Sequence, residues 1–255
     1  MIHSYGYILY CDILGYRSIL ENNDVDDSAK IIIEHIEKID EEIKHDLKVA
    51  YGFDDNTRNI GKCFLDKRIE SINISDSIVV FFDMSNSFDN DREYHTINSL
   101  VMLEYIKSFF RKMIEKGLPL RGCLNCGEFF YHNSMFASKI IPETVSQSEK
   151  LDFSGIMVTK NCVETIKRNS KNVVFKNQLF SYSLFKALVK IKPYSVEERI
   201  LINWINDLTW KKEKITSEKL DFLLETSMKS HNRSFSAQAL NKLENTIHVY
   251  RNILT

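Results

Sequence analysis

Apolar residues recur along the chain with two different spacings, which predict alternating strands and helices. Aromatic and aliphatic residues dominate positions 5–11, 68–74 and 78–83, and such short runs are typical of buried strands. Between residues 26 and 50 the apolar side chains return every third or fourth position, as on one face of an amphipathic helix. Residues 51–67 contain Gly, Asn and Asp, and we expect a loop there.

The same pattern continues through the middle of the chain. A long helix is predicted after the polar loop at 84–91, and it should end near residue 116, before Gly117 and Pro119. Two short strands are predicted at 120–126 and 128–131, pivoting at Gly127, followed by a helix at 138–150 and a strand at 156–159. This β-α-ββ-α-ββ-α-β order predicts an α+β fold of the ferredoxin-like or palm type, with an antiparallel or mixed sheet flanked by helices.

Beyond residue 161 the character of the chain changes. After one helix and a β segment at 173–182 the remainder reads as mainly helical, and Leu240, Leu243, Ile247 and Tyr250 form a helical stripe. We therefore divide the chain into a sheet domain, residues 1–170, and a mainly helical C-terminal extension, residues 171–255. The extension is expected to pack on the sheet domain or to serve self-association.

Composition narrows the classes of protein to consider. Of 255 residues, 44% are hydrophobic and 27% are charged, and the formal net charge is −1, as in an ordinary globular protein. A near-neutral chain argues against a broad basic face for nucleic acid. Residues 1–10 have no basic export-signal region, and no apolar run is long enough to cross a bilayer. We predict a cytoplasmic protein with neither a nucleic-acid nor a membrane partner.

The cysteines raise the question of zinc or redox chemistry. There are five, and Cys123 and Cys126 form a single C-x-x-C. On a strand, side chains three positions apart point to opposite faces, and no second pair at zinc-site spacing is present. We therefore expect buried, reduced thiols of a cytosolic protein at these positions rather than a metal or redox site.

Two aspartates carry the candidate chemistry. Asp12 ends the first strand, and Asp76 lies in the hairpin turn at 75–77. Neighbouring strands lie about 5 Å apart, so the two carboxylates could share a pair of metal ions about 4 Å apart. Carboxylate oxygens suit Mg²⁺ or Mn²⁺ better than zinc. We predict a site for two such ions, which would neutralise triphosphate oxygens and steady a pyrophosphate leaving group.

The residues that follow Asp12 suggest a phosphate contact. The chain leaves the strand at Ile13 and enters a helix, and Gly15 allows a close backbone approach. Backbone N–H groups at a helix start bind phosphate readily. A purely structural interpretation stays open, in which Asp12 caps the helix and Asp76 is an ordinary turn residue.

Several stretches around these residues resemble the class III nucleotidyl cyclases. Residues 10–16 (Tyr-Cys-Asp-Ile-Leu-Gly-Tyr) resemble the first metal-binding motif of the family, and residues 75–79 (Ser-Asp-Ser-Ile-Val) resemble the second. Residues 120–128 resemble the Arg-bearing strand that ends in Gly, and residues 146–150, with Glu149, resemble the helix with an Ala-x-x-Leu-Glu pattern. The resemblance covers roughly residues 5–160 and implies a class III cyclase-like catalytic domain in residues 1–170.

Within that family, the hairpin and the Arg-bearing strand are most similar to the pyrimidine cyclases of the bacterial Pycsar antiphage system. Those enzymes make cyclic UMP or cyclic CMP and are soluble homodimers. The resemblance implies that Asp12 and Asp76 are catalytic metal ligands, that the Ile13 carbonyl joins them, and that the site lies at a homodimer interface. It also implies backbone phosphate contacts from Leu14, Gly15 and Tyr16.

The sequence also departs from the family pattern. Purine cyclases usually carry a base-reading Lys four residues before the second metal Asp, where this chain has Ile72. The transition-state Arg and its partner Asn would fall on Gln147 and Glu143. Arg121 is our candidate for a catalytic phosphate or base contact, with pairing to an acid as the alternative. Asn125 is a candidate for base recognition, with a plain sheet position as the alternative.

Three functions follow from these observations. The first is a pyrimidine nucleotide cyclase that converts UTP, or else CTP, to a 3′,5′-cyclic nucleotide and pyrophosphate, with UTP preferred. The second is a catalytically degenerate nucleotide sensor on the same fold, suggested by the loss of the usual Arg and Asn. The third is a structural protein in which the aspartates are turn caps and the C-terminal helices dock a partner.

Overall fold

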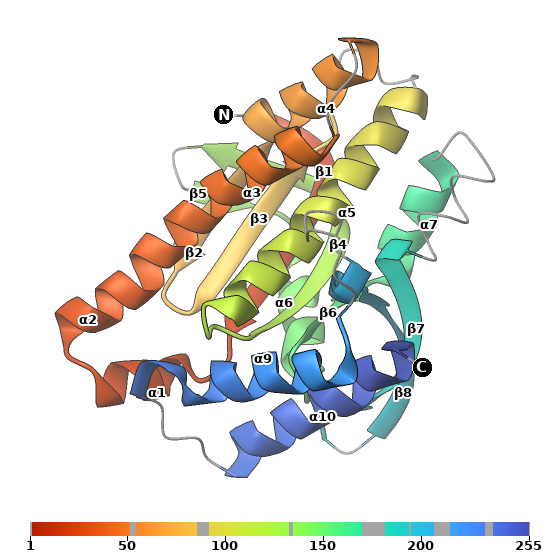
Figure 1. The fold of residues 1–255 in the computed structure, drawn as a ribbon. Coiled ribbons are helices and arrows are strands. Elements are labelled where there is room, and N and C mark those ends of the chain that lie inside the picture. Colours follow the sequence, from red (N-terminus) through yellow and green to blue (C-terminus); the bar gives the residue numbers. More distant parts are fainter. Residues whose placement is uncertain are drawn as a thin grey trace.

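The computed structural model describes residues 2–51, 55–85, 92–132, 135–169, 182–193, 195–206, 215–232 and 237–254. These residues form one 8-stranded sheet with helices on both faces (Figure 1), which confirms the predicted α+β class with a mixed sheet. The strands follow the order β2-β3-β1-β4-β6-β8-β7, and β5 pairs with β4.

Strand β1 is central in the part of the sheet built from the first half of the chain. It pairs antiparallel with β3 on one side and with β4 on the other. Among the described strands, β4 and β6 are the parallel pair. The strand bounds are β1 Ile2–Ile13, β2 Ile69–Ile74, β3 Ser77–Asp83, β4 Leu120–His132, β5 Met135–Ala137, β6 Gly155–Val158, β7 Leu184–Ile191 and β8 Ser195–Ile202.

Helices flank the sheet on its two faces. The predicted helix at 26–50 is confirmed as a continuous run of α2, the π-helical segment η1 and α3, and the long helix before Gly117 is confirmed as α5. The bounds are α1 Tyr16–Asn22, α2 Val25–Ala29, η1 Lys30–Glu34, α3 His35–Tyr51, α4 Asp55–Lys67, α5 Arg92–Glu115, α6 Ile141–Lys150, α7 Lys160–Asn169, η2 Trp204–Asn206, α9 Ser217–Lys229, η3 Ser230–Asn232 and α10 Ala237–Leu254.

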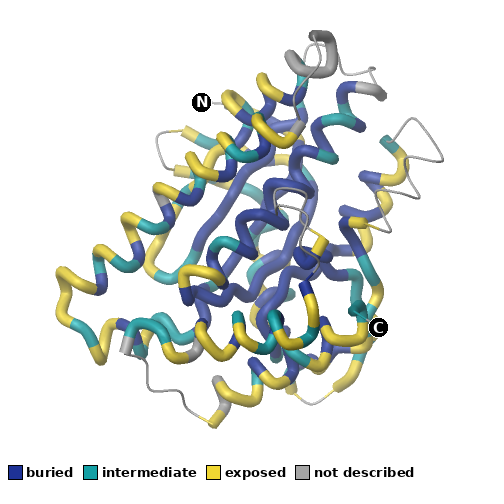
Figure 2. Tube along the Cα trace, viewed as in Figure 1, coloured by how far each residue is buried: buried dark blue, intermediate teal, exposed yellow. Residues whose placement is uncertain are grey.

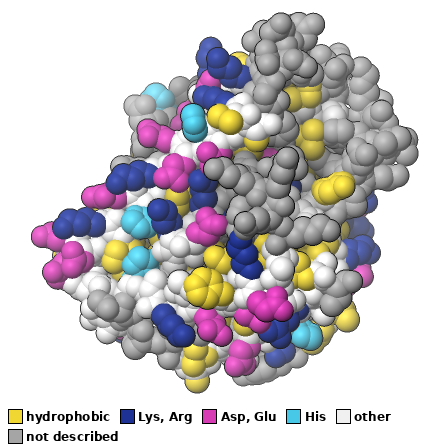
Figure 3. All heavy atoms as spheres, viewed as in Figure 1, with side chains coloured by type: hydrophobic (Ala, Val, Ile, Leu, Met, Phe, Trp, Pro, Cys, Tyr) yellow, Lys and Arg dark blue, Asp and Glu magenta, His cyan; other side chains and the backbone are white. Residues whose placement is uncertain are grey.

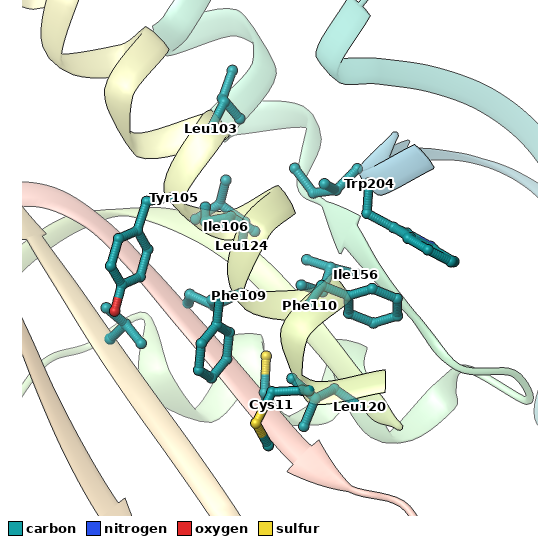
Figure 4. Packing of buried hydrophobic residues seen from close by; sticks show 14 of the residues in the cluster. Cys11, Leu103, Tyr105, Ile106, Phe109, Phe110, Leu120, Leu124, Ile156 and Trp204 are labelled. Carbon is teal, nitrogen blue, oxygen red and sulfur yellow. The ribbon is translucent and has the colours of Figure 1, made fainter. Parts of the chain in front are cut away.

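The main core lies between one face of the sheet and helix α5. Figure 4 shows Phe109 and Phe110 of α5 above Cys11, Leu120 and other strand residues. Figure 2 shows the same layer as mostly buried positions along α5 and the strands beneath it. Because burial of such side chains is the main favourable term in folding, this layer fixes the positions of β1 and β4.

The opposite face of the sheet carries a smaller apolar cluster. Ile8, Val79, Phe81 and Phe129 are buried there, with Tyr10 and Ile141 of α6 packed against them. Alternation along β1 and β4 places Asp12 and Arg121 on this same face. The covering of this face by α6 therefore determines what surrounds the two charged residues.

The loop predicted at 51–67 is wrong, because residues 55–67 form helix α4. Phe64 and Leu65 of this helix are fully buried in the main core. Gly, Asn and Asp have low helix propensity, but burial of an amphipathic face overrides such a weak preference.

The predicted break at Gly127 is also wrong, because β4 runs unbroken from Leu120 to His132. The glycine has a packing role instead. A Cβ atom built on it would lie 2.9 Å from the Ile140 Cγ2 atom. Gly127 thus admits a close neighbour rather than turning the chain.

The C-terminal part contributes to the sheet as well as to the helical layer. Strands β7 and β8 form a hairpin, and β8 pairs with β6. The predicted helical stripe lies in α10, where Leu243 and Tyr250 are buried. The β segment predicted at 173–182 lies outside the described residues except for its last position. The division of the chain at residue 170 stays a prediction.

The described surface carries charges of both signs. On the face shown in Figure 3, basic and acidic side chains are interspersed rather than gathered by sign. Among the described helices, none is both long enough and apolar enough to cross a membrane.

Candidate active site

The two predicted aspartates lie beside each other at one end of the sheet. Asp12 is the penultimate residue of β1, and Asp76 lies in the turn between β2 and β3. The backbone N–H of Ile13 donates to the Asp76 carbonyl oxygen at 2.9 Å, and Asp12 is in register with Ser77. The hairpin therefore brings Asp76 from far along the chain to the end of β1.

Arg121 faces Asp12 from the other side. The two residues are in register between β1 and β4, and the Arg121 Nη2 atom lies 2.6 Å from the Asp12 Oδ2 atom. Their side chains are 11% and 16% exposed, so the ion pair is largely shielded from water. Nη1 donates to the Glu149 carbonyl oxygen at 3.3 Å. Pairing of Arg121 with an acid, one of its two predicted roles, is thus present, and its phosphate or base contact stays a prediction.

The charge of Asp12 is under opposing influences. Burial raises the pKa of its carboxyl group, and the Arg121 guanidinium acts in the opposite direction. The Asp76 carboxylate repels the ionised form and raises the pKa further, so the pKa of Asp12 lies above its usual value. Asp76 is therefore close enough for the two carboxylates to sense each other.

In the segment after Asp12, one of the backbone N–H groups predicted to bind phosphate already has a hydrogen-bond partner within the protein. Gly15 has a φ angle of 79° and is the N-cap residue of α1, so its left-handed conformation starts the helix. The Leu14 N–H donates to the Pro119 carbonyl oxygen at 2.9 Å and is already occupied. A phosphate contact by Leu14 would require that bond to break. The contacts of Gly15 and Tyr16 with phosphate stay predictions.

Asn125 is held away from any open surface. It is buried, and its Oδ1 atom accepts from the Cys126 N–H at 2.9 Å and from the Thr159 hydroxyl at 2.8 Å. Its Nδ2 atom donates to the Thr144 hydroxyl of α6 at 3.2 Å. These bonds join β4 to its neighbours, and base recognition by Asn125 stays a prediction without geometric support.

Three positions at which the sequence differs from the cyclase pattern lie on β2 and on α6, a helix that contacts β1 and β4. Ile72 is half-buried on β2, and Glu143 and Gln147 lie on α6. The Gln147 Oε1 atom is buried and has no hydrogen-bond partner among the described residues. An amide at this position can donate and accept hydrogen bonds but cannot supply the positive charge of an arginine.

Two further residues, Tyr10 and Lys242, belong to this environment and were missed as candidates. Burial raises the pKa of Tyr10, and so does repulsion of its phenolate by Asp12, Asp76 and Glu149. Burial lowers the pKa of Lys242 in α10, and Arg121 and Lys192 lower it further, while Asp152 and Asp12 oppose the shift. Alternation along β1 could have indicated Tyr10, but no local pattern links Lys242 to Asp12.

The donor set fits hard divalent cations. Two carboxylates that repel each other can be neutralised together by Mg²⁺ or Mn²⁺, and both ions prefer oxygen ligands. Within the described residues, no group of three or more His, Cys, Asp or Glu side chains gathers to hold a metal. Asp12, Asp76 and the Ile13 carbonyl would hold such ions, and a bound phosphate would have to complete their coordination.

Neither a protein-family model nor a curated protein matches this chain. Solved structures give weak matches. The guanylyl cyclase Cya2 is 12% identical, with a TM-score of 0.43 over 79% of this chain and 91% of that chain. The adenylyl cyclase CyaB from P. aeruginosa is 8% identical, with a TM-score of 0.42 over 84% and 98%. A class III adenylyl cyclase-like ATP-binding protein from Pseudomonas aeruginosa is 11% identical, with a TM-score of 0.45 over 70% and 39%. Similarity at this level assigns no function.

Proposed function

We propose that this protein is a nucleotide cyclase that converts UTP, or else CTP, to the 3′,5′-cyclic nucleotide and pyrophosphate. The observation that carries the proposal is the convergence of Asp12, Asp76 and Arg121 at one end of the sheet. Two carboxylates beside a shielded guanidinium provide ligands for cations and a donor for phosphate in one place.

The reaction is an intramolecular displacement. The ribose 3′ oxygen forms a bond to the α-phosphorus, and the bond from that phosphorus to the bridging oxygen of the β-phosphate breaks. When bound, two Mg²⁺ or Mn²⁺ ions supply charge neutralisation for the triphosphate and acidify the attacking hydroxyl. Asp12 helps to take up the hydroxyl proton, and Arg121 binds phosphate oxygens that become more negative as pyrophosphate leaves.

The pyrimidine preference rests on the resemblance of residues 75–79 and 120–128 to the Pycsar cyclases. Ile72 is compatible with it, because an apolar side chain there cannot read a purine as lysine does. By the same resemblance the protein acts in the cytoplasm as a homodimer, and its product is a second messenger that activates an effector in antiphage defence. The exposed Ile74 at the end of β2, 54% accessible, lies beside Asp76 and offers apolar surface to a second copy.

The test is incubation of the purified chain with each of UTP, CTP, ATP and GTP and Mn²⁺ or Mg²⁺, followed by chromatography and a pyrophosphate assay. We expect a cyclic pyrimidine nucleotide from the natural chain and none from Asp12→Asn or Asp76→Asn. The matched control is Asp26→Asn, because Asp26 is exposed on α2 and has no role in the site. Full activity in Asp12→Asn would reject the site assignment.

A nucleotide sensor is the second candidate, favoured by Gln147 and Glu143 at the positions of the family's Arg and Asn. A sensor would bind a nucleoside triphosphate through the same residues without releasing pyrophosphate. Equilibrium binding of UTP measured alongside the pyrophosphate assay separates the two functions, since only a cyclase gives both signals.

A further inference from the structure

A polar cluster surrounds the Cys126 thiol on the sheet face opposite Asp12 and Arg121. Cys126 lies in β4 and is 1% exposed. Its Sγ atom accepts from the Asn161 Nδ2 atom at 3.4 Å and lies 3.4 Å from the Thr165 Oγ1 atom. The Tyr5 hydroxyl donates to it at 4.0 Å from β1. So many polar groups around one sulfur are unusual for a cysteine that only fills space.

A second thiol completes the cluster. Cys162 lies between Asn161 and Thr165 in the first turns of α7 and is fully buried in the same core cluster as Cys126. Both cysteines are free thiols in the structure. Asn161 and Thr165 flank Cys162 on α7 and both lie 3.4 Å from the Cys126 sulfur, so the helix places the Cys162 thiol close enough to influence that of Cys126.

The two thiols differ in acidity. The hydrogen bond from Cys162 lowers the pKa of Cys126 most, burial opposes it, and Thr165, Tyr5 and Arg168 add to the lowering, which brings the pKa to about 6. Burial and the hydrogen bond to Cys126 raise the pKa of Cys162 well above its usual value. The surroundings thus favour the thiolate form at Cys126 and the protonated thiol at Cys162, the pairing that thiol oxidation uses.

We propose that Cys126 and Cys162 form an oxidation site for small hydroperoxides. The Cys126 thiolate attacks one peroxide oxygen, the O–O bond breaks, and hydroxide leaves, giving a sulfenic acid. The Cys162 sulfur then attacks the Cys126 sulfur, and its proton and the sulfenic hydroxyl group leave together as water. The product is a Cys126–Cys162 disulfide between β4 and α7, with two electrons passed to the peroxide, and an external dithiol reverses it.

The C-x-x-C partner of Cys126 does not take part. Cys123 lies three residues earlier on the same strand and faces the other side of the sheet, as predicted, and burial raises its pKa strongly. Access favours small oxidants, because Tyr5 and Asn161, which lie at the rim of the cluster, are exposed while Cys126 itself is not. Bulky reagents should reach the exposed Cys63 instead.

The test uses the full chain with Cys63→Ser, so that the exposed thiol does not contribute. After hydrogen peroxide treatment, acid quenching and alkylation in denaturant, mass spectrometry should find one linked peptide pair containing residues 126 and 162. Cys162→Ser should leave a sulfenic acid on Cys126 that dimedone traps. Cys123→Ser, the matched control, should form the 126–162 link at the unchanged rate.

Three results would overturn the proposal. They are absence of the 126–162 link while other thiols oxidise, a link between Cys126 and Cys123, and oxidation of Cys126 no more selective than in urea-denatured chain. The linkage measurement on the Cys63→Ser chain alone decides the matter if the other substitutions disturb folding. None of these readouts depends on nucleotide cyclase activity.

Discussion

The Asp12 carboxylate is attracted by the Arg121 guanidinium and repelled by the Asp76 carboxylate. This arrangement bears on the structural interpretation, in which the aspartates are only caps. The N-cap of α1 is Gly15, and no side chain caps that helix, so Asp12 does not serve as its cap. The repulsion between Asp12 and Asp76 is a cost that a turn cap gives no reason to maintain, whereas a cation-binding site requires it.

A divalent cation should therefore stabilise the protein at pH 7. The pKa of Asp12 is raised in the folded state, so the folded protein binds the Asp12 proton more tightly than the unfolded chain does. The resulting contribution to folding stability is complete below the ordinary pKa of about 3.8 and is lost as the pH rises through the folded pKa. A cation held by Asp12 and Asp76 would offset the repulsion between the two carboxylates. When the free Mn²⁺ concentration is a hundred times its Kd, the free energy of unfolding measured in urea should increase by about 2.7 kcal/mol. A chelator should remove this increase.

The matched variants decide whether this stabilisation comes from the site. Asp76→Asn should lose most of it, and Asp26→Asn should keep it. An unchanged unfolding midpoint with and without Mn²⁺ in the natural chain would support the turn-cap interpretation.

The reactivity of Cys126 should depend on pH as a thiolate does. Its charged and titratable neighbours are Tyr5 and Tyr7 on β1 and Cys162 and Arg168 on α7. With a pKa of about 6, its thiolate fraction is nearly complete at pH 7. Its iodoacetamide alkylation rate should therefore rise less than about twofold between pH 7 and 8, whereas an ordinary thiol with a pKa near 8.5 gains about eightfold.

The measurement is peptide-resolved alkylation of the folded Cys63→Ser chain, with the same chain in urea as the reference. In urea the hydrogen-bond donors are lost, so the eightfold dependence should return. An eightfold rise in the folded chain would show that the cluster does not stabilise the thiolate.

The sequence was sufficient to find functional candidates whose neighbouring residues form a recognisable pattern. Asp12 ends an apolar run and Asp76 lies in a short turn between two such runs, so each has a signal in its own neighbours. Lys242 lies in a helix far along the chain, and only the packing of α10 brings it within electrostatic range of Asp12. The Cys126–Cys162 contact was missed for the same reason, because the visible motif paired Cys126 with Cys123.

At the level of elements, the failures came where tertiary contacts outweighed local preference. Helix α4 has weak helix formers, yet buried Phe64 and Leu65 hold it on the core. The β7–β8 hairpin carries charged residues on its outer positions, which obscured the apolar alternation that includes Val189 and Ile191. The strands β1 and β3 were predictable because their apolar runs are short, continuous and bounded by polar residues.

The cross-strand glycines Gly6 and Gly127 offer a test of strand packing. They are in register between β1 and β4. A Cβ at Gly6 would lie 2.0 Å from the Phe82 carbonyl oxygen, whereas one at Gly127 would meet the flexible Ile140 side chain at 2.9 Å. Gly6→Ala should therefore cost about 3 kcal/mol or more and Gly127→Ala about 1 kcal/mol, measured by urea unfolding. Equal costs would mean that the backbone contact at Gly6 relaxes easily.

For the whole molecule, the sheet connects both parts of the chain. Strand β6 pairs with β4 on one side and with β8 on the other, so the hairpin from the C-terminal part covers an edge. The fully buried Lys107 of α5 donates to the Asn206 carbonyl oxygen at 2.9 Å, and Phe110 packs on Trp204. The candidate site is influenced from both parts too, since Arg121 helps to lower the pKa of Lys242 in α10.

A chain that ends at residue 169 should therefore fail to fold. It would expose the β6 edge and the apolar surface beneath Trp204 and Tyr250. It would also remove the Asn206 hydrogen bond from the buried Lys107, which keeps its ion pair with Glu104. The loss of this burial is large against the roughly 5–15 kcal/mol that stabilises a domain. Circular dichroism, gel filtration and limited proteolysis should show an unfolded or aggregated product. The control is the full chain with a protease site at position 175. After cleavage its two pieces should elute together with an unchanged spectrum, since the contacts between them remain. A stable, monodisperse 1–169 fragment would instead establish the division at residue 170 that the sequence predicts.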